Sequence, residues 1–209
     1  MQYRIIPVTS FAENCTIIWC EKTKKAAIVD PGGESAQIKK LISQLDVMIE
    51  KILLTHGHLD HVGAASELAQ YYNVAIYGPN EQDQFLLDNL PLQAAQFGLP
   101  FASAFTPDHW LKDGDVLAIG EQVLHVIHCP GHTPGHVVFV NQTTKLALVG
   151  DVLFKGSIGR TDFPRGNYQD LMHSIKQKLW PLGDDIQFIS GHGPMSTLGD
   201  ERRTNPFLR

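Results

Sequence analysis

Residues 51–63 read KILLTHGHLDHVG. The apolar run at the start ends in a polar turn that contains glycine, which is typical of a buried strand that enters a functional loop. His56 and His58 are two positions apart, so in extended chain their imidazoles face the same way. Asp60 and His61 follow in the predicted first turn of an alanine-rich helix and can point at a second centre. Three imidazoles and a carboxylate are therefore predicted to face one cavity.

The composition limits the classes of protein to which this chain can belong. The chain has 209 residues, of which 43% are hydrophobic, and this length suits a single domain, residues 1–209, with a substantial core. Its 17 basic and 22 acidic residues give a net charge of -5, so nucleic acid is not expected as the main partner. The three cysteines show no C-x-x-C spacing, so we expect buried thiols rather than a disulfide framework or a zinc knuckle.

The sequence carries no pattern of a targeting segment. The start, MQYRIIPVTSF, lacks the charged residues, long apolar run and small-residue cleavage site of a signal peptide. No apolar run reaches membrane-spanning length, so no membrane partner is expected. We therefore expect a cytoplasmic protein. No pattern bears on the oligomeric state.

Short β-rich runs alternate with turns along both halves of the chain. We expect strands, the first three of them antiparallel, at residues 3–8, 15–20, 26–30, 52–54, 74–77, 116–119, 122–128, 136–141, 145–149 and 186–189. The turn from Asp30 to Gly33 ends the third strand. One helix is expected around Ile38 and another behind Asn167 as a cap. Strands dominate each half and helices punctuate them, so the pattern predicts an α/β (α+β) protein with two packed sheets and helices outside.

Residues 80–110 interrupt this pattern. Pro91, Gly98 and Pro100 lie among many apolar residues, which predicts short broken helices in an insertion on the substrate side of the site. The phenylalanines of this insertion either line a pocket or pack in a local core. They are Phe85, Phe97, Phe101 and Phe105.

Three later stretches supply further ligand-type side chains. His132 lies in CPGHTPGH, Asp151 ends LALVGD, and His192 lies in FISGHG. Each side chain comes directly after an apolar strand, so four strand ends could bring all of them to one edge of a sheet pair. In isolation the two histidines would be hydrogen-bonded turn residues, and the aspartate a cap or turn former. Their repeated placement favours one shared site.

Taken together, these residues resemble the metallo-β-lactamase superfamily over nearly the whole chain. Within it, THGHLDH, PGHTPGH, GDVLFKGSIGRTDFP and SGHGP are similar to the glyoxalase II branch, the hydroxyacylglutathione hydrolases, and most of all to its short bacterial members. The resemblance implies an αββα sandwich, with two mixed β-sheets flanked by helices and the metals at one edge.

The resemblance also implies seven metal ligands divided between two Zn²⁺ sites. The first site would use His56, His58 and His132, the second Asp60, His61 and His192, and Asp151 would bridge them. Fe or Mn would suit the same ligands, and partial occupancy of the two sites is an open alternative.

This ligand set suits hydrolysis of a thioester. Two divalent ions that share a water lower its pKa toward about 7, and Asp60 would orient the resulting metal-bound hydroxide. The positive site would stabilise the oxyanion that forms when hydroxide attacks a carbonyl. A thiolate has a pKa of about 8.5 and leaves without a dedicated acid, so an acyl thioester is the easiest small-molecule substrate. The resemblance implies, more specifically, hydrolysis of S-lactoylglutathione to lactate and glutathione, the type II glyoxalase step of methylglyoxal detoxification.

The sequence offers only a few candidate residues for binding the substrate. Full-length members of the branch continue into a helical C-terminal domain that contacts glutathione, whereas this sequence ends at Arg209, so no such domain is expected and glutathione specificity stays open. Arg160 is placed like a basic residue that the family uses on the glutathione carboxylate, and Lys155 is a weaker candidate, as are Arg202 and Arg203. A solvated surface cation is the alternative for each.

Other functions stay open beside the hydrolase. A persulfide dioxygenase looks similar in fold and in the GRTDF stretch but holds one iron with two His and one Asp; such proteins tend to carry Cys where this chain has Gly57 and Ser157. A lactonase or another thioesterase would use the same site. A metal-binding module without catalysis would have closed coordination, whereas these ligands leave positions open. Asp151, in place of the Cys of many zinc β-lactamases, argues against antibiotic hydrolysis.

Overall fold

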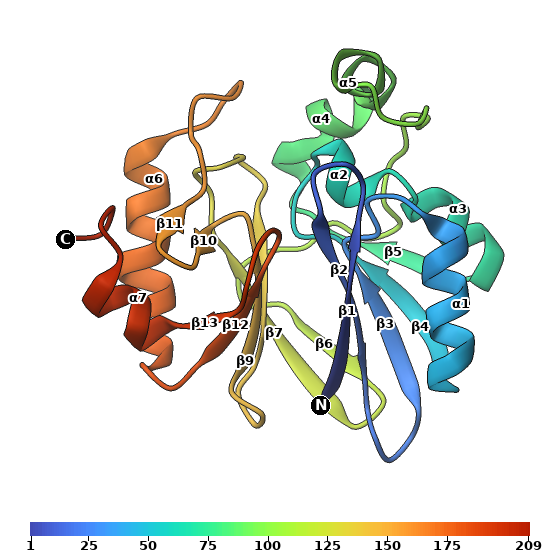
Figure 1. The fold of residues 1–209 in the computed structure, drawn as a ribbon, viewed down its shortest axis with the longest axis horizontal. Helices are drawn as coiled ribbons and strands as arrows, with labels where there is room; N and C mark the ends of the chain where they lie inside the picture. Colours follow the sequence, from blue (N-terminus) through green and yellow to red (C-terminus); the bar gives the residue numbers. More distant parts are fainter.

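The computed structural model describes residues 1–209, which form two β-sheets packed face to face with helices on their outer faces (Figure 1). In spatial order the first sheet contains β1 (Gln2–Val8), β2 (Glu13–Trp19), β3 (Lys25–Val29), β4 (Met48–Leu53) and β5 (Ala75–Tyr77). Strands β1 to β3 are antiparallel, as predicted, while β4 and β5 run parallel to β3. The first sheet is therefore mixed.

The second sheet is mixed as well. In spatial order it contains β13 (Ser196–Thr197), β12 (Gln187–Ser190), β9 (Leu146–Gly150), β8 (Val137–Asn141), β7 (Gln122–His128) and β6 (Val116–Ile119). Strands β12 and β9 are parallel and all other neighbours antiparallel. The predicted bounds of β6 and β7 are confirmed to the residue. A separate hairpin, β10 (Leu153–Phe154) and β11 (Ser157–Ile158), was not expected from the sequence.

Helices cover the outer face of each sheet. The first half contains α1 (Ser35–Leu45), α2 (Leu59–Val62), α3 (Ala65–Tyr72), the 3-10 turn η1 (Glu81–Asp83), α4 (Gln84–Asp88) and α5 (Leu90–Phe97). The second half contains α6 (Tyr168–His173), the π-helical η2 (Ser174–Leu179), the 3-10 turn η3 (Trp180–Leu182) and α7 (Leu198–Thr204). As predicted, residues 80–110 begin with short broken helices and Asn167 caps α6, accepting hydrogen bonds from the N–H groups of Gln169 and Asp170. No helix is both long and apolar enough to cross a bilayer.

The alanine-rich helix expected after His58 is in fact two helices. Asp60 and His61 lie in the short α2, and the chain breaks at Gly63 before α3 begins. A Cβ on Gly63 would come within 2.5 Å of the carbonyl oxygen of Gly32 in the turn after β3. Only glycine permits this close approach, so a tertiary contact, which periodicity does not reveal, sets the break.

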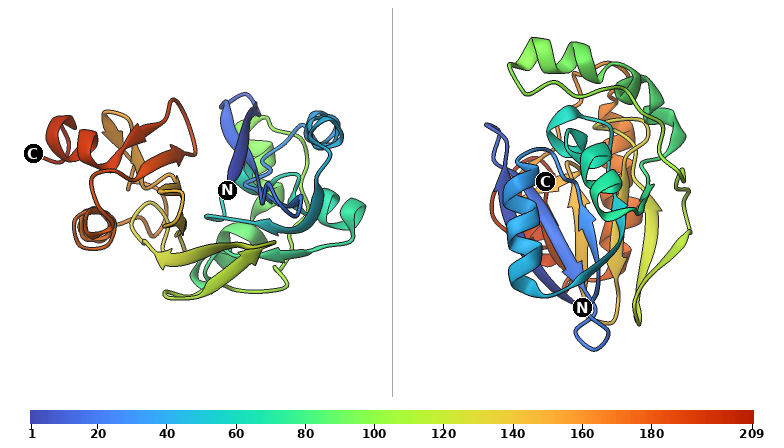
Figure 2. Two further views of the ribbon diagram at one scale, coloured as in Figure 1. Left: turned by 90° about the horizontal axis from the view of Figure 1, so that it is seen from below. Right: turned by 90° about the vertical axis from the view of Figure 1, so that its right-hand side faces the viewer.

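Three apolar clusters fill the spaces between the layers. Because successive strand residues point to opposite faces, Ile28 lies under α1 while Val29 faces the second sheet. In β8 the same alternation sends Phe139 toward the first sheet and Val138 toward α6. The central strands β3, β8 and β9 are therefore buried on both faces and read as continuous apolar runs, whereas β6 and β7 alternate between buried and exposed residues. Seen from below in Figure 2, helices, sheet, sheet and helices follow one another, so the predicted αββα sandwich is confirmed.

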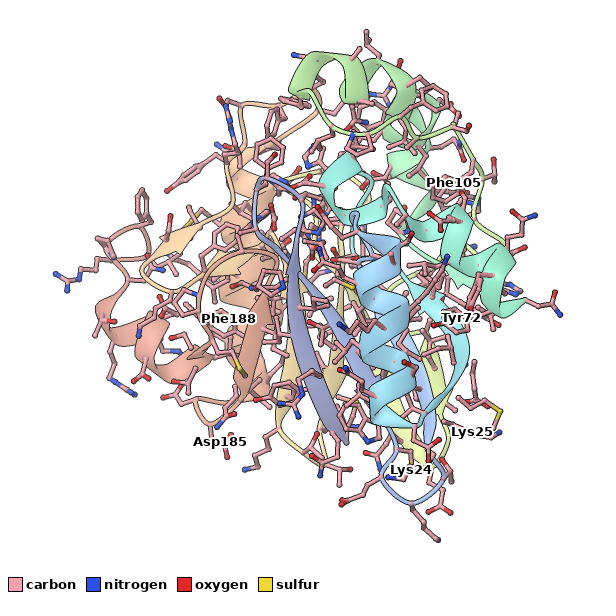
Figure 3. All side chains as sticks on the ribbon, turned by 45° about the vertical axis from the view of Figure 1, so that its right-hand side comes forward. Lys24, Lys25, Tyr72, Phe105, Asp185 and Phe188 are labelled. Carbon is pink, nitrogen blue, oxygen red and sulfur yellow. The ribbon has the colours of Figure 1, made fainter.

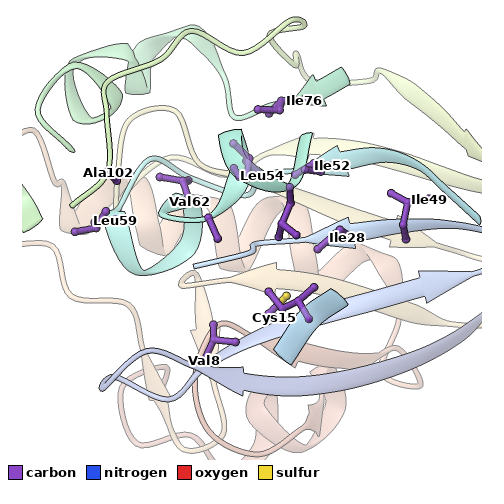
Figure 4. Close-up of a cluster of buried hydrophobic side chains, with 14 of the residues drawn as sticks. Val8, Cys15, Ile28, Ile49, Ile52, Leu54, Leu59, Val62, Ile76 and Ala102 are labelled. Carbon is purple, nitrogen blue, oxygen red and sulfur yellow. The ribbon is translucent and has the colours of Figure 1, made fainter. Parts of the chain in front are cut away.

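The outer clusters anchor the helices to the sheets. Figure 4 shows the cluster of the first sheet, where Cys15, Ile28 and Ile52 from β2, β3 and β4 gather on one face. Phe188 marks the outer cluster of the second sheet in Figure 3, on the opposite side of the molecule from Phe105. All three cysteines are buried and unpaired, as expected.

Candidate metal centre

The predicted ligand side chains converge at one end of the two sheets. β4 runs into the loop of His56 and His58, while β7, β9 and β12 are followed by His132, Asp151 and His192. Strands β7, β9 and β12 point the same way, because β8 is antiparallel to both of its neighbours and β12 is parallel to β9. Their carboxyl ends therefore share one edge, which lies at the top of Figure 1 beside α2.

Three histidines form the first group of donors. His56 Nε2 lies 3.1 Å from His58 Nδ1, and His132 Nε2 lies 3.0 Å from the same atom. For comparison, neighbouring nitrogens bound tetrahedrally to a zinc ion at about 2.1 Å would be about 3.4 Å apart. The spacing of this group therefore suits one small cation.

The Nδ1 atoms of His132 and His56 form hydrogen bonds that determine which ring nitrogen carries the lone pair. His132 Nδ1 donates to the carbonyl oxygen of Arg160 at 2.8 Å. His56 Nδ1 lies 3.0 Å from Thr55 Oγ1, whose own proton goes to the carboxylate of Asp30 at 2.6 Å. Both Nδ1 atoms therefore carry protons, which leaves lone pairs on the Nε2 atoms that face the centre of the group. Lone pairs that face one another need a cation between them.

A second group of donors lies beside the first. His192 Nε2 is 3.4 Å from Asp60 Oδ2 and 3.7 Å from Asp151 Oδ2. His61 Nε2 is 3.5 Å from Asp151 Oδ1, and His132 Nε2 of the first group is 3.6 Å from Asp151 Oδ2. His61 Nε2 and Asp151 Oδ1 are buried without a hydrogen-bond partner. Because buried polar atoms are rarely unpaired, this donor set fits a second cation, with Asp151 between the two groups.

The electrostatics of the two groups differ. Burial, reinforced by the neighbouring imidazoles, lowers the pKa of His56 and His58 far below the usual range. Burial acts on His61 in the same direction, but the carboxylates of Asp151 and Asp60 prevail and raise its pKa to about 9. Burial would raise the pKa of Asp60, yet the charge on His61 holds it well below the usual range. The first group thus offers neutral imidazoles and Asp60 of the second an ionised carboxylate, which are ligand forms that divalent ions bind, whereas His61 would have to lose a proton to bind one.

Asp30 is a supporting residue that the sequence interpretation missed. Its carboxylate accepts hydrogen bonds from Thr55 N at 2.7 Å, Thr55 Oγ1 at 2.6 Å and His61 Nδ1 at 3.0 Å. It therefore orients one ring from each group. The sequence pattern indicates only a strand end and turn at Asp30, although Asp30 follows AAIV much as Asp151 follows LALVG. That parallel was the available signal.

Two further buried residues back the ligands. His136, just before β8, stacks its ring on that of His56 with 4.7 Å between centroids, and its Nε2 accepts from the N–H of Asp151 at 3.0 Å. Glu13 is fully buried behind His61, 3.7 Å from its Nδ1, and burial raises the pKa of Glu13 well above the usual range. Nothing in the local sequence distinguishes Glu13 from an ordinary strand residue.

Asp83 ties together the loops that carry the first group. Its buried carboxylate accepts from Gly57 N at 2.9 Å, Thr133 Oγ1 at 2.8 Å and Gly135 N at 2.6 Å. Burial raises its pKa to about 6, and these hydrogen bonds oppose the rise. Asp83 therefore holds the loop of His56 against the loop of His132.

Replacing Asp83 with alanine is expected to lower the free energy of unfolding by about 3 kcal/mol, because buried donors without acceptors cost about 1–3 kcal/mol each and local relaxation recovers part of the sum. Denaturant unfolding of the metal-free protein measures the change. The matched control is Asp88→Ala on α4, where the carboxylate is exposed and a change below about 0.5 kcal/mol is expected. Equal losses in the two variants would contradict the role given to Asp83.

A cavity of about 820 Å³ opens above the two groups. One wall comes from α4, α5 and the residues just after them, the other from the β10–β11 hairpin and the loop that follows it, and Phe11 adds the turn between β1 and β2. Phe85 and Phe97 line the cavity, whereas Phe105 packs against the core and Phe101 is exposed. Apolar side chains dominate both walls.

The four basic residues predicted to contact the substrate lie at different distances from the cavity. Arg160 lines the cavity, but its Nε and Nη2 each donate to the carboxylate of Asp162 at 2.6 Å, and its guanidinium lies 4.1 Å from the centroid of the Phe163 ring. Lys155 is exposed in the β10–β11 turn, outside the residues that line the cavity. Arg202 and Arg203 lie on α7, where Arg202 pairs with Asp184 before β12 and Arg203 pairs with Asp200 on the same helix. Of the four, only Arg160 faces the cavity.

Known proteins are similar to this chain over most of its length. The family model described as the metallo-beta-lactamase superfamily matches residues 8–192. Hydroxyacylglutathione hydrolase GloC of Haemophilus influenzae is 53% identical over 209 residues, which cover 100% of this chain and 98% of that protein. The crystal structure of BLEG-1 B3 metallo-beta-lactamase has 34% identity and a TM-score of 0.91 over 99% of each chain. That of TTHA1623 in a di-iron-bound form has 34% identity and a TM-score of 0.90 over 98% of this chain and 100% of the other.

Proposed function

Because this chain belongs to the metallo-beta-lactamase superfamily, we propose that it is a metal-dependent hydrolase of acyl thioesters and that its substrate is S-lactoylglutathione. The observation that carries the proposal is the pair of donor groups that share Asp151 on the floor of a cavity. The 53% identity to a hydroxyacylglutathione hydrolase supports the choice of substrate. The three unpaired cysteines suit a reducing compartment, so we place the protein in the cytoplasm.

The donor groups suggest how two divalent ions would be held. We assign one ion to His56, His58 and His132, a second to Asp60, His61 and His192, and both to Asp151. When bound, the ions would supply a Lewis acid for the carbonyl and lower the pKa of a water. We propose Zn²⁺, with iron as the alternative content, because nitrogen and carboxylate donors suit both and the similar TTHA1623 was solved in a di-iron-bound form.

The residues of the chain then have separate roles. Asp60 lines the cavity as an ionised carboxylate, so it accepts a hydrogen bond from the attacking water and orients that water toward the carbonyl carbon. The apolar walls, among them the wall from residues 80–110, exclude other water from the thioester. The attacking water gives up a proton to solvent and its oxygen forms the C–O bond, which leaves an oxyanion. When the oxyanion collapses, the C–S bond breaks and the thiolate leaves with the electron pair, for which its pKa of about 8.5 requires no acid.

Hydrolysis of a β-lactam is a second candidate, because BLEG-1, a B3 metallo-beta-lactamase, is 34% identical with a TM-score of 0.91. The leaving nitrogen of an amide must be protonated as it departs. The cavity wall offers no acidic side chain besides Asp60 and Asp151, which the donor groups already use. We therefore expect the thioester to be the better substrate.

The test is turnover by purified protein whose metal content is measured on the same sample. We expect hydrolysis of S-lactoylglutathione, with close to two divalent ions per chain at full activity and a much lower kcat/KM for a β-lactam. Chelation should remove the activity, and zinc or iron should restore it. One iron per chain and oxygen-dependent turnover of a persulfide, with no thioester cleavage, would replace the proposal with the dioxygenase.

A further inference from the structure

Two arginines lie in the loop of residues 159–167, which forms part of the cavity wall, and they differ in what surrounds their charge. The guanidinium of Arg160 forms two parallel hydrogen bonds to Asp162, so a neighbouring carboxylate already offsets its charge. Arg165 forms no ion pair or side-chain hydrogen bond. Its guanidinium lies 4.2 Å from the centroid of the Phe85 ring. Of the two cations, Arg165 is the one with free donors.

The position over the Phe85 ring leaves those donors available. A guanidinium packed by its flat face against a ring keeps its five N–H groups free, because they all lie in its plane. An arginine held in this way loses little side-chain freedom when it binds a carboxylate. Arg165 is therefore prepared for a two-pronged hydrogen bond to an anion.

Arg165 is not among the residues that line the cavity, but it lies beside it and contacts both walls through neighbouring residues. Phe85, on α4, lines one wall, while Pro164, the residue before Arg165, lines the other. In Figure 1 these are the helix labelled α4 and the loop between β11 and α6. A molecule bound in the cavity against Phe85 or Pro164 is therefore close to Arg165.

Arg165 is also close to the two donor groups. The ring of Phe163 lies 5.0 Å from the ring of His58 and 6.0 Å from that of His132, between centroids. Arg165 is two residues further along, and two residues of extended chain span at most about 7 Å. A substrate of tripeptide size can therefore contact Arg165 while its thioester lies at the donor groups.

The charges around the cavity favour an anion at this place. Its lining contains two acidic side chains, Asp60 and Asp151, and both belong to the donor groups. No carboxylate of the protein offsets Arg165. We propose, on the basis of the function proposed above, that Arg165 determines substrate specificity by binding a carboxylate of the thiol portion. The substrate class is then acyl thioesters whose thiol carries a carboxylate several bonds from the sulfur.

The experiment compares S-lactoylglutathione with its diethyl ester, in which both carboxylates of the thiol portion are blocked. For Arg165→Gln we expect the KM for S-lactoylglutathione to rise about 10- to 100-fold with kcat nearly unchanged, since a charge-assisted pair contributes about 1.5–3 kcal/mol. The KM for the diester should change less than about twofold. Arg165→Lys should recover part of the loss, because it keeps the charge but not the fork. Arg4→Gln, on the exposed face of β1, is the control without effect.

The outcomes separate this inference from the function on which it rests. If Arg165→Gln leaves both KM values unchanged, or raises both equally, the inference is wrong while turnover by the wild type still supports the thioesterase. A KM effect confined to Arg160→Gln would likewise overturn it in favour of Arg160. If the wild type cleaves neither thioester, the proposed function fails and the inference fails with it. Should Arg165→Gln not fold, the same comparison with Arg165→Lys decides.

Discussion

Alanine in place of Asp151 is expected to abolish thioester hydrolysis and to release at least one metal ion. Asp151 is the one side chain with oxygens close to both donor groups: Oδ1 lies 3.5 Å from His61 Nε2, and Oδ2 lies 3.6 Å from His132 Nε2. Its removal takes away a negative charge between two cations as well as a ligand. Metal catalysis contributes several kcal/mol to transition-state stabilisation, so we expect kcat/KM to fall by about 1,000-fold or more.

Metal analysis and kinetics on one preparation of Asp151→Ala measure this effect. Asp151→Asn keeps the shape of the side chain without its charge, so it should retain the fold and still lose metal. The control is Asp185→Ala, whose exposed carboxylate pairs with Lys145 far from the cavity and should have no effect on turnover. Full metal content together with normal turnover in Asp151→Ala would rule out the bridging role.

Replacing Asp30 with alanine should weaken metal binding although Asp30 is not a proposed ligand. The change leaves Thr55 N, Thr55 Oγ1 and His61 Nδ1 without their buried acceptor. Residues that orient metal ligands typically contribute 10- to 100-fold in metal affinity, and we expect a loss of about this size. The unpaired donors should also lower the free energy of unfolding of the metal-free protein by about 3 kcal/mol.

Titration against a competing chelator measures the affinity of Asp30→Ala, and unfolding with excess chelator measures its stability. Asp30 has a φ of 50°, a left-handed conformation that asparagine tolerates better than alanine. Asp30→Asn therefore separates loss of the carboxylate charge from backbone strain, and it should lose affinity with a smaller loss of stability. Wild-type affinity in both variants would show that Asp30 does not orient His61.

Local patterns predicted the strands well, and the side chains proposed as ligands do lie close together. β6 and β7 were bounded correctly because turn residues flank short alternating runs. The ligand side chains could be recognised because each follows an apolar strand, and parallel strand ends share an edge. The resemblance supplied the division into two groups, which spacing alone does not give.

Tertiary contacts account for the features that the sequence did not reveal. Asp83 bonds to Gly57 and Gly135, which are 26 and 52 residues away, so no local pattern identifies it. The break between α2 and α3 depends on the approach of Gly63 to Gly32. The β10–β11 hairpin has strands of two residues each, too short for periodicity to indicate.

The placement of the proposed ligands on loops of both sheets has a consequence for how the chain folds. The first group needs His56 from the first sheet and His132 from the second, and the second group needs His61 and His192. Contacts between residues so distant in sequence form late, because long loops must close before they can be made. Each sheet can thus form before any complete ion site exists. Metal ions would then bind only molecules whose two halves have already docked, and by mass action would stabilise that docked state over its precursors.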